Sequence, residues 1–115
     1  MKFPVFVENS RIPVWLSKIS PIEIGAISLG LFVFSRNEMD ETVRRHETIH
    51  YYQWKELGFV FFPILYGLFW LINVAKCLGG EQAYYEIPFE REAYSNEHDA
   101  HYLEKRPLWA WRKYL

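Results

Sequence analysis

Hydrophobic and polar positions follow a helical spacing between residues 41 and 57. Apolar side chains share one stripe with two histidines and a glutamate, and the stripe consists of Val43, His46, Glu47, His50, Trp54 and Leu57. Residues spaced by three and four positions lie on the same face of an α-helix. Asp40 is a suitable N-cap for a helix that begins at Glu41, and Gly58 is a typical terminator. The pattern therefore predicts a helix over 41–57 whose histidines face the interior.

The first 35 residues contain short apolar runs that are separated by Pro4, Pro13 and Pro21. The runs over residues 3–7 and 26–34 have the length and the composition of strands. We expect these residues to form a small N-terminal sheet.

Two further helices are predicted in the second half of the chain. Residues 58–75 carry no charge over eighteen positions and are rich in Phe, Leu and Ile, which indicates a second helix. Pro88 is well placed at the first position of a third helix, which we expect to end near Lys105. Pro107 then precedes a short aromatic piece over residues 108–115.

Composition and charge exclude several classes of protein. A chain of 115 residues that is 50% hydrophobic and 19% aromatic is too apolar for a disordered segment, and we expect a single domain over 1–115. Its expected fold class is α+β, mostly helical. The formal net charge of −1 provides no basic field, so no nucleic-acid partner is expected. The lone Cys77 and the absence of a sustained apolar run in residues 1–10 favour a cytoplasmic location, with membrane association as the alternative.

The segment from His46 to His50 carries the motif His-Glu-x-x-His. Side chains four residues apart on a helix project side by side, so both imidazoles can reach one ion. Zinc lowers the pKa of a bound water, and a glutamate beside it can accept the proton. We therefore expect His46 and His50 to bind Zn²⁺ and Glu47 to be the general base of a hydrolase. The alternative is that these are ordinary polar residues of a half-buried helix, but buried polar groups need partners, and a metal would satisfy them.

A catalytic zinc site needs a third protein ligand and keeps a fourth position open for water. The segment after Pro88 offers six candidates, which are Glu90, Glu92, Glu97, His98, Asp99 and His101. Residue types alone do not decide among them. Glu90 lies in the first turn of the predicted helix, where packing beside the HExxH helix is geometrically natural, whereas Glu92 points to another face. His98 and His101 are interpreted as part of a solvated helix face.

Residues 45–53 read RHETIHYYQ and residues 83–94 read AYYEIPFEREAY. Together these segments resemble a family of small bacterial zincin-like proteins of the gluzincin type. In gluzincins the third-ligand helix reads Glu-x-x-x-Asp with its first Glu on the metal, so the resemblance implies Glu90 as the third ligand. Tyr94 stands where many gluzincins have the Asp that steadies a histidine ligand. A phenol can accept a histidine N–H, but it brings no charge.

The resemblance implies a minimal zincin-like core in which an edge strand near residues 27–34 borders the cleft and aligns an extended peptide. The predicted function is zinc-dependent hydrolysis of a peptide or protein substrate, with Tyr84, Tyr85 or Tyr94 stabilising the oxyanion. The alternative is a non-catalytic, metal-stabilised binding or membrane-surface module. The two differ in their response to Glu47→Gln, which preserves metal binding in both but abolishes turnover only in the enzyme.

The uncharged segment over residues 58–75 has two interpretations. About 20 apolar residues at 1.5 Å each cross roughly 30 Å of hydrocarbon, so the segment is long enough to span a membrane. A single crossing would place Glu90 on the opposite side of the bilayer from the two histidines, which excludes a shared metal site. Pro63, Asn73 and the compactness that coordination requires favour a buried helix, or one that contacts a membrane surface. Its aromatic stripe is either core or a face for lipid or a partner, and consists of Phe62, Tyr66, Phe69 and Trp70.

Overall fold

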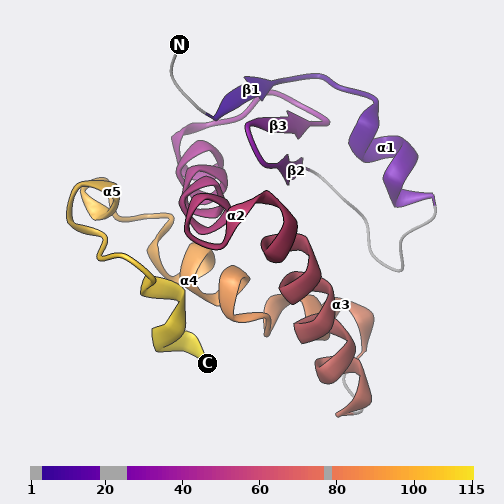
Figure 1. Ribbon diagram of the computed structural model, residues 1–115. Coiled ribbons are helices and arrows are strands. Elements are labelled where there is room, and N and C mark those ends of the chain that lie inside the picture. Colours follow the sequence, from indigo (N-terminus) through magenta and orange to yellow (C-terminus); the bar gives the residue numbers. More distant parts are fainter. Residues whose placement is uncertain (1–3, 19–25, 77–78) are drawn as a thin grey trace.

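The structure is a computed structural model that describes residues 4–18, 26–76 and 79–115 (Figure 1). Its elements in chain order are β1 (Val5–Val7), α1 (Ile12–Ser17), β2 (Ala26–Leu29), β3 (Phe32–Ser35), α2 (Glu41–Ala75), α3 (Gly80–Tyr85), α4 (Pro88–Asn96), α5 (Tyr102–Lys105) and the 3-10 helix η1 (Ala110–Tyr114). A small sheet precedes the helices, so the predicted α+β, mostly helical fold is confirmed. In Figure 1 the sheet lies on one side of α2, and α4 lies on the other.

The sheet has the strand order β1-β3-β2, with β1 parallel and β2 antiparallel to β3. The apolar run over residues 26–34 supplies both β2 and most of β3, because the chain reverses at Gly30. This glycine has φ 72°, a left-handed conformation that glycine adopts without strain. The predicted N-terminal sheet is therefore confirmed. β1 and β2 are its two edge strands, whereas β3, which is part of the predicted edge segment 27–34, is central. Phe3 and Pro21 lie outside the described residues.

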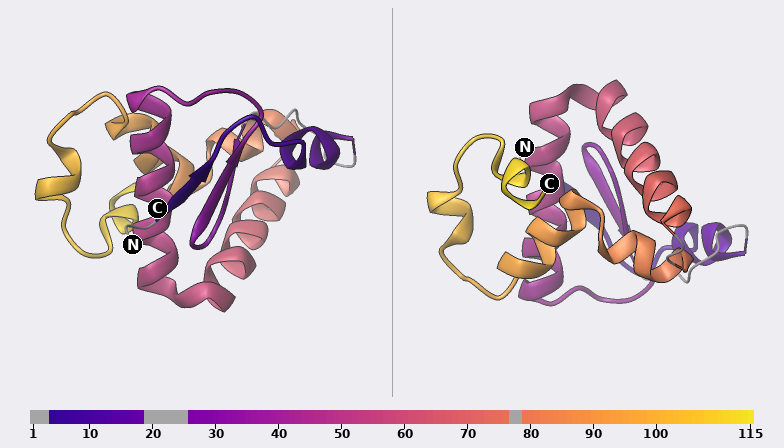
Figure 2. Two further views of the ribbon diagram at one scale, coloured as in Figure 1. Left: turned by 90° about the horizontal axis from the view of Figure 1, so that it is seen from above. Right: turned by 90° about the horizontal axis from the view of Figure 1, so that it is seen from below.

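Helix α2 begins and bends where the sequence predicts. The Asp40 carboxylate accepts a hydrogen bond from the Val43 backbone N–H at 2.9 Å, which is the expected N-cap contact. Gly58 adopts φ 76° and ψ 159°, a non-helical conformation that divides α2 into segments over 41–57 and 59–75. The two segments diverge from this glycine, and the strands lie over the angle between them (Figure 2).

The aromatic stripe of the 59–75 segment packs against α4. Phe62 is 4% exposed, and its ring centroid lies 4.8 Å from that of the fully buried Phe89. Tyr66, Phe69 and Trp70 pack against the same core cluster. Of the two interpretations of this stripe, core packing is therefore confirmed.

The opposite face of the 59–75 segment is exposed. Only 11% of the most apolar 18-residue window of α2 is buried, although this helix is long and apolar enough to cross a membrane. Val60 and Phe61 are 67% and 64% exposed. The prediction of a buried helix is therefore wrong for this face, because the helix is covered only on the side where α3 and α4 pack.

The third predicted helix ends earlier than expected. Helix α4 stops at Asn96, and the short α5 follows after a turn, whereas the pattern predicts one helix from Pro88 to Lys105. The Asn96 side chain donates to the Glu92 carbonyl at 2.8 Å, and the Asp99 carboxylate accepts from the His101 backbone N–H at 3.0 Å. Such local side-chain bonds compete with the helical backbone pattern and favour a turn.

Candidate metal centre

His46, His50 and Glu90 converge on one point in the core. The two histidines lie one turn apart on α2, and Glu90 comes from the first turn of α4. Glu90 Oε1 lies 3.1 Å from Nε2 of each histidine, and the two Nε2 atoms are 3.2 Å apart. All three residues are buried, with exposures of 5%, 4% and 4%. The structure thus brings together the three residues predicted as ligands.

The triangle of donor atoms has nearly the size of one face of a tetrahedral zinc site. Bonds of about 2.0–2.1 Å at tetrahedral angles place the ligand atoms of one Zn²⁺ about 3.3 Å apart. The separations in this protein are 3.1, 3.1 and 3.2 Å. Two imidazole nitrogens and one carboxylate oxygen are also the donor types that zinc prefers, so the residues present fit this ion.

Each imidazole is oriented by a hydrogen bond at its other ring nitrogen. His46 Nδ1 lies 2.7 Å from Glu97 Oε2, and His50 Nδ1 lies 2.7 Å from Gln53 Oε1. Both partner oxygens are acceptors, so Nδ1–H donates in each ring and Nε2 remains to bind an ion. Metal-binding histidines are usually held in this way. Gln53 is not among the predicted site residues, although its position three residues after His50 on the same helix is a signal that points to this contact.

Tyr94 contacts His46 through its ring and not through its hydroxyl. Its ring packs edge-on against His46, with centroids 4.4 Å apart, and its hydroxyl lies 3.0 Å from that of Tyr84. The charged support of His46 comes instead from Glu97, three residues further along the chain. His46 therefore has an acidic partner, at a position that the sequence analysis considers only as a third ligand.

Gln53 is itself held by a buried ionic network. Its amide donates to Glu92 Oε1 at 3.0 Å, and Arg106 donates to Glu92 at 2.6 Å and to both oxygens of Glu56 at 2.9 and 3.0 Å. Glu92 is 0% exposed, and a buried carboxylate needs a paired cation and hydrogen bonds. The network connects the C-terminal segment with His50 through Gln53.

The charges of the cluster shift the pKa values of its members. Burial opposes protonation of His46, but hydrogen bonds with Glu90 and Glu97 outweigh it and raise the pKa of His46 to about 10. Burial alone would raise the pKa of Glu90, whereas the adjacent His50 and His46 lower it well below its usual range. Without a metal the cluster is therefore a histidine–carboxylate ion pair. A bound cation would replace the imidazole proton, so protons compete with the metal for this site.

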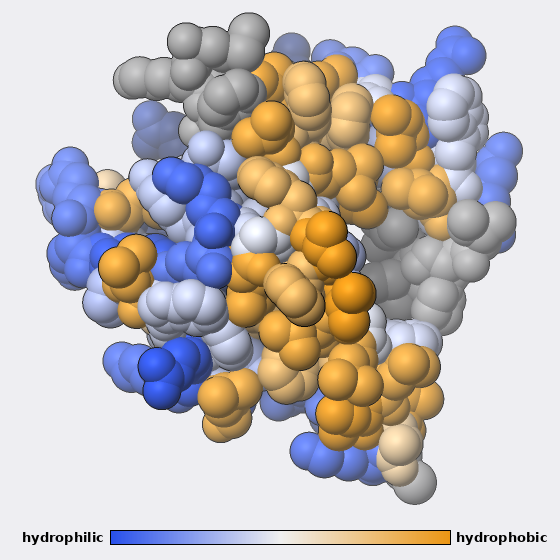
Figure 3. All heavy atoms as spheres, viewed as in Figure 1, coloured by the Kyte–Doolittle hydropathy of each residue, from blue (hydrophilic) through white to orange (hydrophobic). Residues whose placement is uncertain are grey.

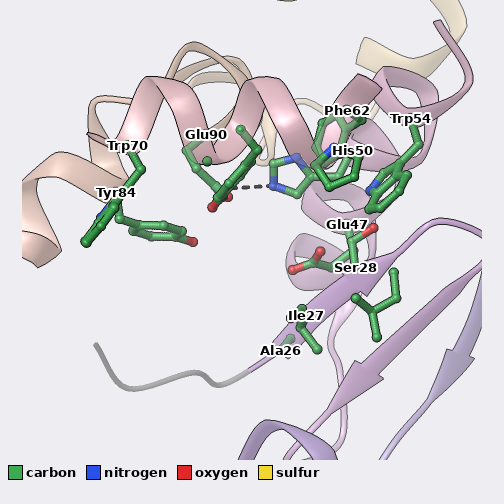
Figure 4. A pocket seen from close by; sticks show the side chains of 14 residues that line it. Ala26, Ile27, Ser28, Glu47, His50, Trp54, Phe62, Trp70, Tyr84 and Glu90 are labelled. Carbon is green, nitrogen blue, oxygen red and sulfur yellow. Dashed lines mark hydrogen bonds and ion pairs between the residues drawn. The ribbon is translucent and has the colours of Figure 1, made fainter. Parts of the chain in front are cut away.

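Glu47 faces a cavity beside the three converging side chains. The cavity has a volume of about 440 Å³ and lies between the edge strand β2 and the 59–75 segment, with Glu47, His50 and Glu90 in its wall (Figure 4). Glu47 is 7% exposed, and its burial raises the pKa of its carboxyl group above the usual value. The predicted general base thus lies on the same cavity as two of the predicted ligands.

Two polar groups in the cavity wall lack a hydrogen-bond partner within the part of the chain that the structure describes. They are the Ser28 hydroxyl on β2 and the Trp54 indole N–H on α2, and both atoms are buried. Buried polar atoms are nearly always paired, so an unpaired donor beside a cavity is a candidate contact for a ligand. Neither residue is among the predicted site residues, because Ser28 and Trp54 carry no motif.

Of the three tyrosines predicted to stabilise an oxyanion, Tyr84 lies in the cavity wall. Tyr85 is 45% exposed, and Tyr94 packs on His46. A further tyrosine, Tyr66 of α2, donates from its hydroxyl to Glu90 Oε2 at 2.7 Å. Tyr66 thereby fixes the second carboxylate oxygen of the predicted third ligand.

The other candidates for the third ligand lie apart from the triangle. Glu92 belongs to the ionic network with Arg106, and Glu97 supports His46 from the opposite side of its ring. His98 and His101 have side chains that are each 79% exposed, which confirms their interpretation as part of a solvated surface. Asp99 pairs with Lys105 at 2.8 Å.

Comparison of the chain with protein-family models, with curated proteins and with solved structures gives no match.

Proposed function

We propose that this protein is a zinc-dependent hydrolase and that its substrate is a peptide. The observation that carries this proposal is the triangle of His46 Nε2, His50 Nε2 and Glu90 Oε1, with sides of 3.1 to 3.2 Å, beside a cavity that Glu47 lines. A structural zinc site is usually closed by four protein ligands, whereas a catalytic one has three and an open position. Three protein donors next to a cavity support the catalytic type.

His46, His50 and Glu90 would hold the ion, which supplies a bound water of lowered pKa and polarises a carbonyl group. Glu47 accepts the proton of the attacking water at its carboxylate and can pass it to the leaving amine. Of the three predicted tyrosines, Tyr84 is the one in the cavity wall, and we assign to it the hydrogen bond to the developing oxyanion. Glu97 and Gln53 keep the two imidazoles in the tautomer that presents Nε2.

A peptide substrate is supported by the edge strand beside the cavity. Residues Ala26 to Leu29 of β2 line the cavity, and among the described residues only β3 pairs with β2. A free strand edge can pair with an extended peptide through main-chain hydrogen bonds. The cavity wall is mostly apolar, as is usual for a ligand site.

The Glu47→Gln variant tests the proposal. Metal content is measured by elemental analysis, and hydrolysis is followed by mass spectrometry of a random peptide library. We expect Glu47→Gln to bind zinc at the wild-type stoichiometry and to lose activity by roughly 10²–10⁴-fold, because general-base catalysis contributes about that much. Wild-type protein that binds zinc but cleaves no peptide would favour the non-catalytic module instead.

The ligand assignment is tested separately with Glu90→Ala and His46→Ala. Each variant removes one corner of the triangle, so both are expected to lose stoichiometric zinc. The matched control is Glu104→Ala, whose side chain is 78% exposed. Full zinc retention in Glu90→Ala would refute Glu90 as the third ligand.

A further inference from the structure

The exposed side of the 59–75 segment is entirely apolar. Every residue of this segment that is exposed carries an apolar side chain. The large ones, with exposures from 37% to 67%, are Phe59, Val60, Phe61, Ile64, Leu68, Leu71, Ile72 and Val74. At 1.5 Å per residue the segment is about 25 Å long. We call this surface the apolar face.

The tip of the β2–β3 hairpin extends the apolar face. Leu29 and Phe32 are 45% and 44% exposed, and Leu31 between them is 36% exposed. The turn packs against the start of the segment, since a Cβ atom at Gly30 would lie 2.9 Å from the Phe59 ring. Figure 3 shows hydrophobic side chains over the second half of α2 and over the strands beside it. Contiguous apolar surfaces of this kind mark sites of association.

We propose that the apolar face binds the surface of a lipid bilayer, with the 59–75 segment lying in the membrane plane. An 18-residue window of α2 has a mean hydropathy of 2.0, which is high enough for a membrane-crossing helix, and yet only 11% of it is buried. A core helix of a water-soluble protein would be mostly buried. The apolar side chains that give the helix its high hydropathy therefore lie on the surface of the molecule, where they are suited to contact lipid hydrocarbon.

The absence of polar groups favours lipid over a protein partner or a second copy of this chain. Protein–protein interfaces form about one hydrogen bond per 100–200 Å² and have a polar rim. The exposed positions of the 59–75 segment supply neither, because none of them carries a polar side chain. A bilayer interior requires no directional contacts, and a helix surface without donors or acceptors suits it.

Hydrogen bonds on the opposite side exclude a complete span. Tyr66 donates to Glu90, Trp70 Nε1 to the Gly80 carbonyl at 3.1 Å, and Asn73 to the Ala83 carbonyl at 3.0 Å. These contacts attach the helix along its length to α3 and α4, which carry charged residues. Only one side of the helix can therefore face lipid, and this is the arrangement of an amphipathic helix in the membrane interface.

The charge of the protein indicates which membranes it binds. With a net charge of −1, the chain has no excess of basic residues to attract anionic headgroups. Binding should come from insertion of apolar side chains, so neutral vesicles should suffice and added salt should not weaken it.

The test is flotation of the full chain with neutral phosphatidylcholine vesicles in a density gradient, at low and at high salt. The variant Ile64→Lys/Leu68→Lys places two charges on the apolar face at residues that are 58% and 48% exposed. The matched control is Leu108→Lys/Leu115→Lys, which makes the same chemical change at C-terminal residues that are 80% and 71% exposed. We expect wild type and control to float at both salt concentrations. The face variant should lose binding by roughly 100-fold or more, because it loses the burial of two large apolar side chains.

Three results would overturn the proposal. The first is wild-type protein that stays at the bottom of the gradient, including the case in which it forms a dimer that Ile64→Lys/Leu68→Lys dissociates. The second is equal flotation of wild type and the face variant. The third is wild-type protein that resists extraction from vesicles at alkaline pH, since that behaviour indicates a span. Flotation requires no turnover, so these results are independent of the proposed hydrolase.

Discussion

At the scale of single residues, the contact between His46 and Glu97 decides how well the proposed site can bind an ion. The carboxylate holds the Nδ1 proton at 2.7 Å and adds negative charge next to the imidazole, which strengthens Nε2 as a ligand. Glu97 lies just beyond the end of α4, and its side chain is 17% exposed. The ring orientation of His46 therefore depends on a residue that lies outside the helix carrying the proposed third ligand.

Replacement of Glu97 by alanine should weaken zinc binding without unfolding the protein. Loss of such a partner typically reduces metal affinity about 10–100-fold. Competition with a chromogenic chelator measures the affinity, and Glu104→Ala, with a side chain that is 78% exposed, serves as the control. Equal zinc affinities of Glu97→Ala and the control would show that the contact does not support the metal.

The unpaired hydroxyl of Ser28 leads to a prediction about stability. An unsatisfied buried polar group costs about 1–3 kcal/mol, so Ser28→Ala should leave the free energy of unfolding unchanged or raise it by about 1 kcal/mol. Ser35→Ala on the neighbouring strand is the control. The Ser35 hydroxyl accepts a hydrogen bond from the Asn37 backbone N–H at 3.3 Å, so its removal should lower the free energy of unfolding. Urea unfolding measures both. A loss in Ser28→Ala as large as in Ser35→Ala would mean that the Ser28 hydroxyl has a partner in the folded protein.

At the scale of elements, the bend of α2 at Gly58 allows both of its segments to contribute to one site. The 41–57 segment carries His46 and His50, and the 59–75 segment returns Tyr66 to Glu90. The combination of φ 76° and ψ 159° lies in a region that is almost restricted to glycine. A straight helix of the same length would direct Tyr66 away from the histidines.

Gly58→Ala should therefore destabilise the protein by about 1–3 kcal/mol, because alanine is strained in that conformation. Gly67→Ala is the matched control within the same helix: no atom lies within 4 Å of an added Cβ there, and its φ is not positive. Alanine at that position should be neutral or stabilising by about 0.5–1 kcal/mol. Thermal or urea unfolding measures the change in the free energy of unfolding for each variant, and the two changes should differ in sign or clearly in size. Equal changes would exclude a special role of Gly58.

Local signals predict the long helical segments and the strands, but they miss two short helices. Asp40, Gly58 and Pro88 each determine the backbone conformation at their own position. The helix boundaries that were placed at these residues therefore agree with the structure. Helices α1 and α3 have six residues each, and neither was predicted. A helix that short is marginal in isolation and forms only when tertiary packing covers it, which a local pattern cannot report.

The same division between local and distant signals holds for the site. The spacing of His46 and His50 is a property of one helix, and Glu90 follows from the start of the next one. The contact between Glu97 and His46 depends on where α4 ends. The Arg106 network depends on how the C-terminal segment folds back. Both involve residues that lie 14 to 52 positions apart in the chain, so no short pattern contains them.

At the scale of the whole molecule, Arg106 neutralises two buried carboxylates from different elements. Its side chain is 4% exposed, as against 6% for Glu56 and 0% for Glu92. Removal of one partner from a buried ion pair costs about 3–5 kcal/mol. Because small domains have about 5–15 kcal/mol in total, this single arginine accounts for a large part of the stability.

Arg106→Ala should lower the free energy of unfolding by about 3–5 kcal/mol, measured by urea unfolding. Should this variant not fold, Arg106→Lys keeps the charge, loses the forked contacts and should give an intermediate loss. Lys105→Ala is the control: its side chain is 64% exposed and pairs only with Asp99 at the surface, so the change should stay within about 0.5 kcal/mol. A loss for Arg106→Ala no larger than for Lys105→Ala would contradict the buried network.

The position of Arg106 after all three donor residues also affects when the site can form during translation. All three donor atoms come from residues up to Glu90, but Glu92 keeps an uncompensated charge until Arg106 has left the ribosome. Gln53 donates to Glu92 and accepts from His50, so its side chain can adopt its final position only after Arg106 pairs with Glu92. A nascent chain that stalls before residue 106 would therefore carry the complete HExxH motif and still lack an ordered site, so the metal centre is expected to mature only after Arg106 has been added.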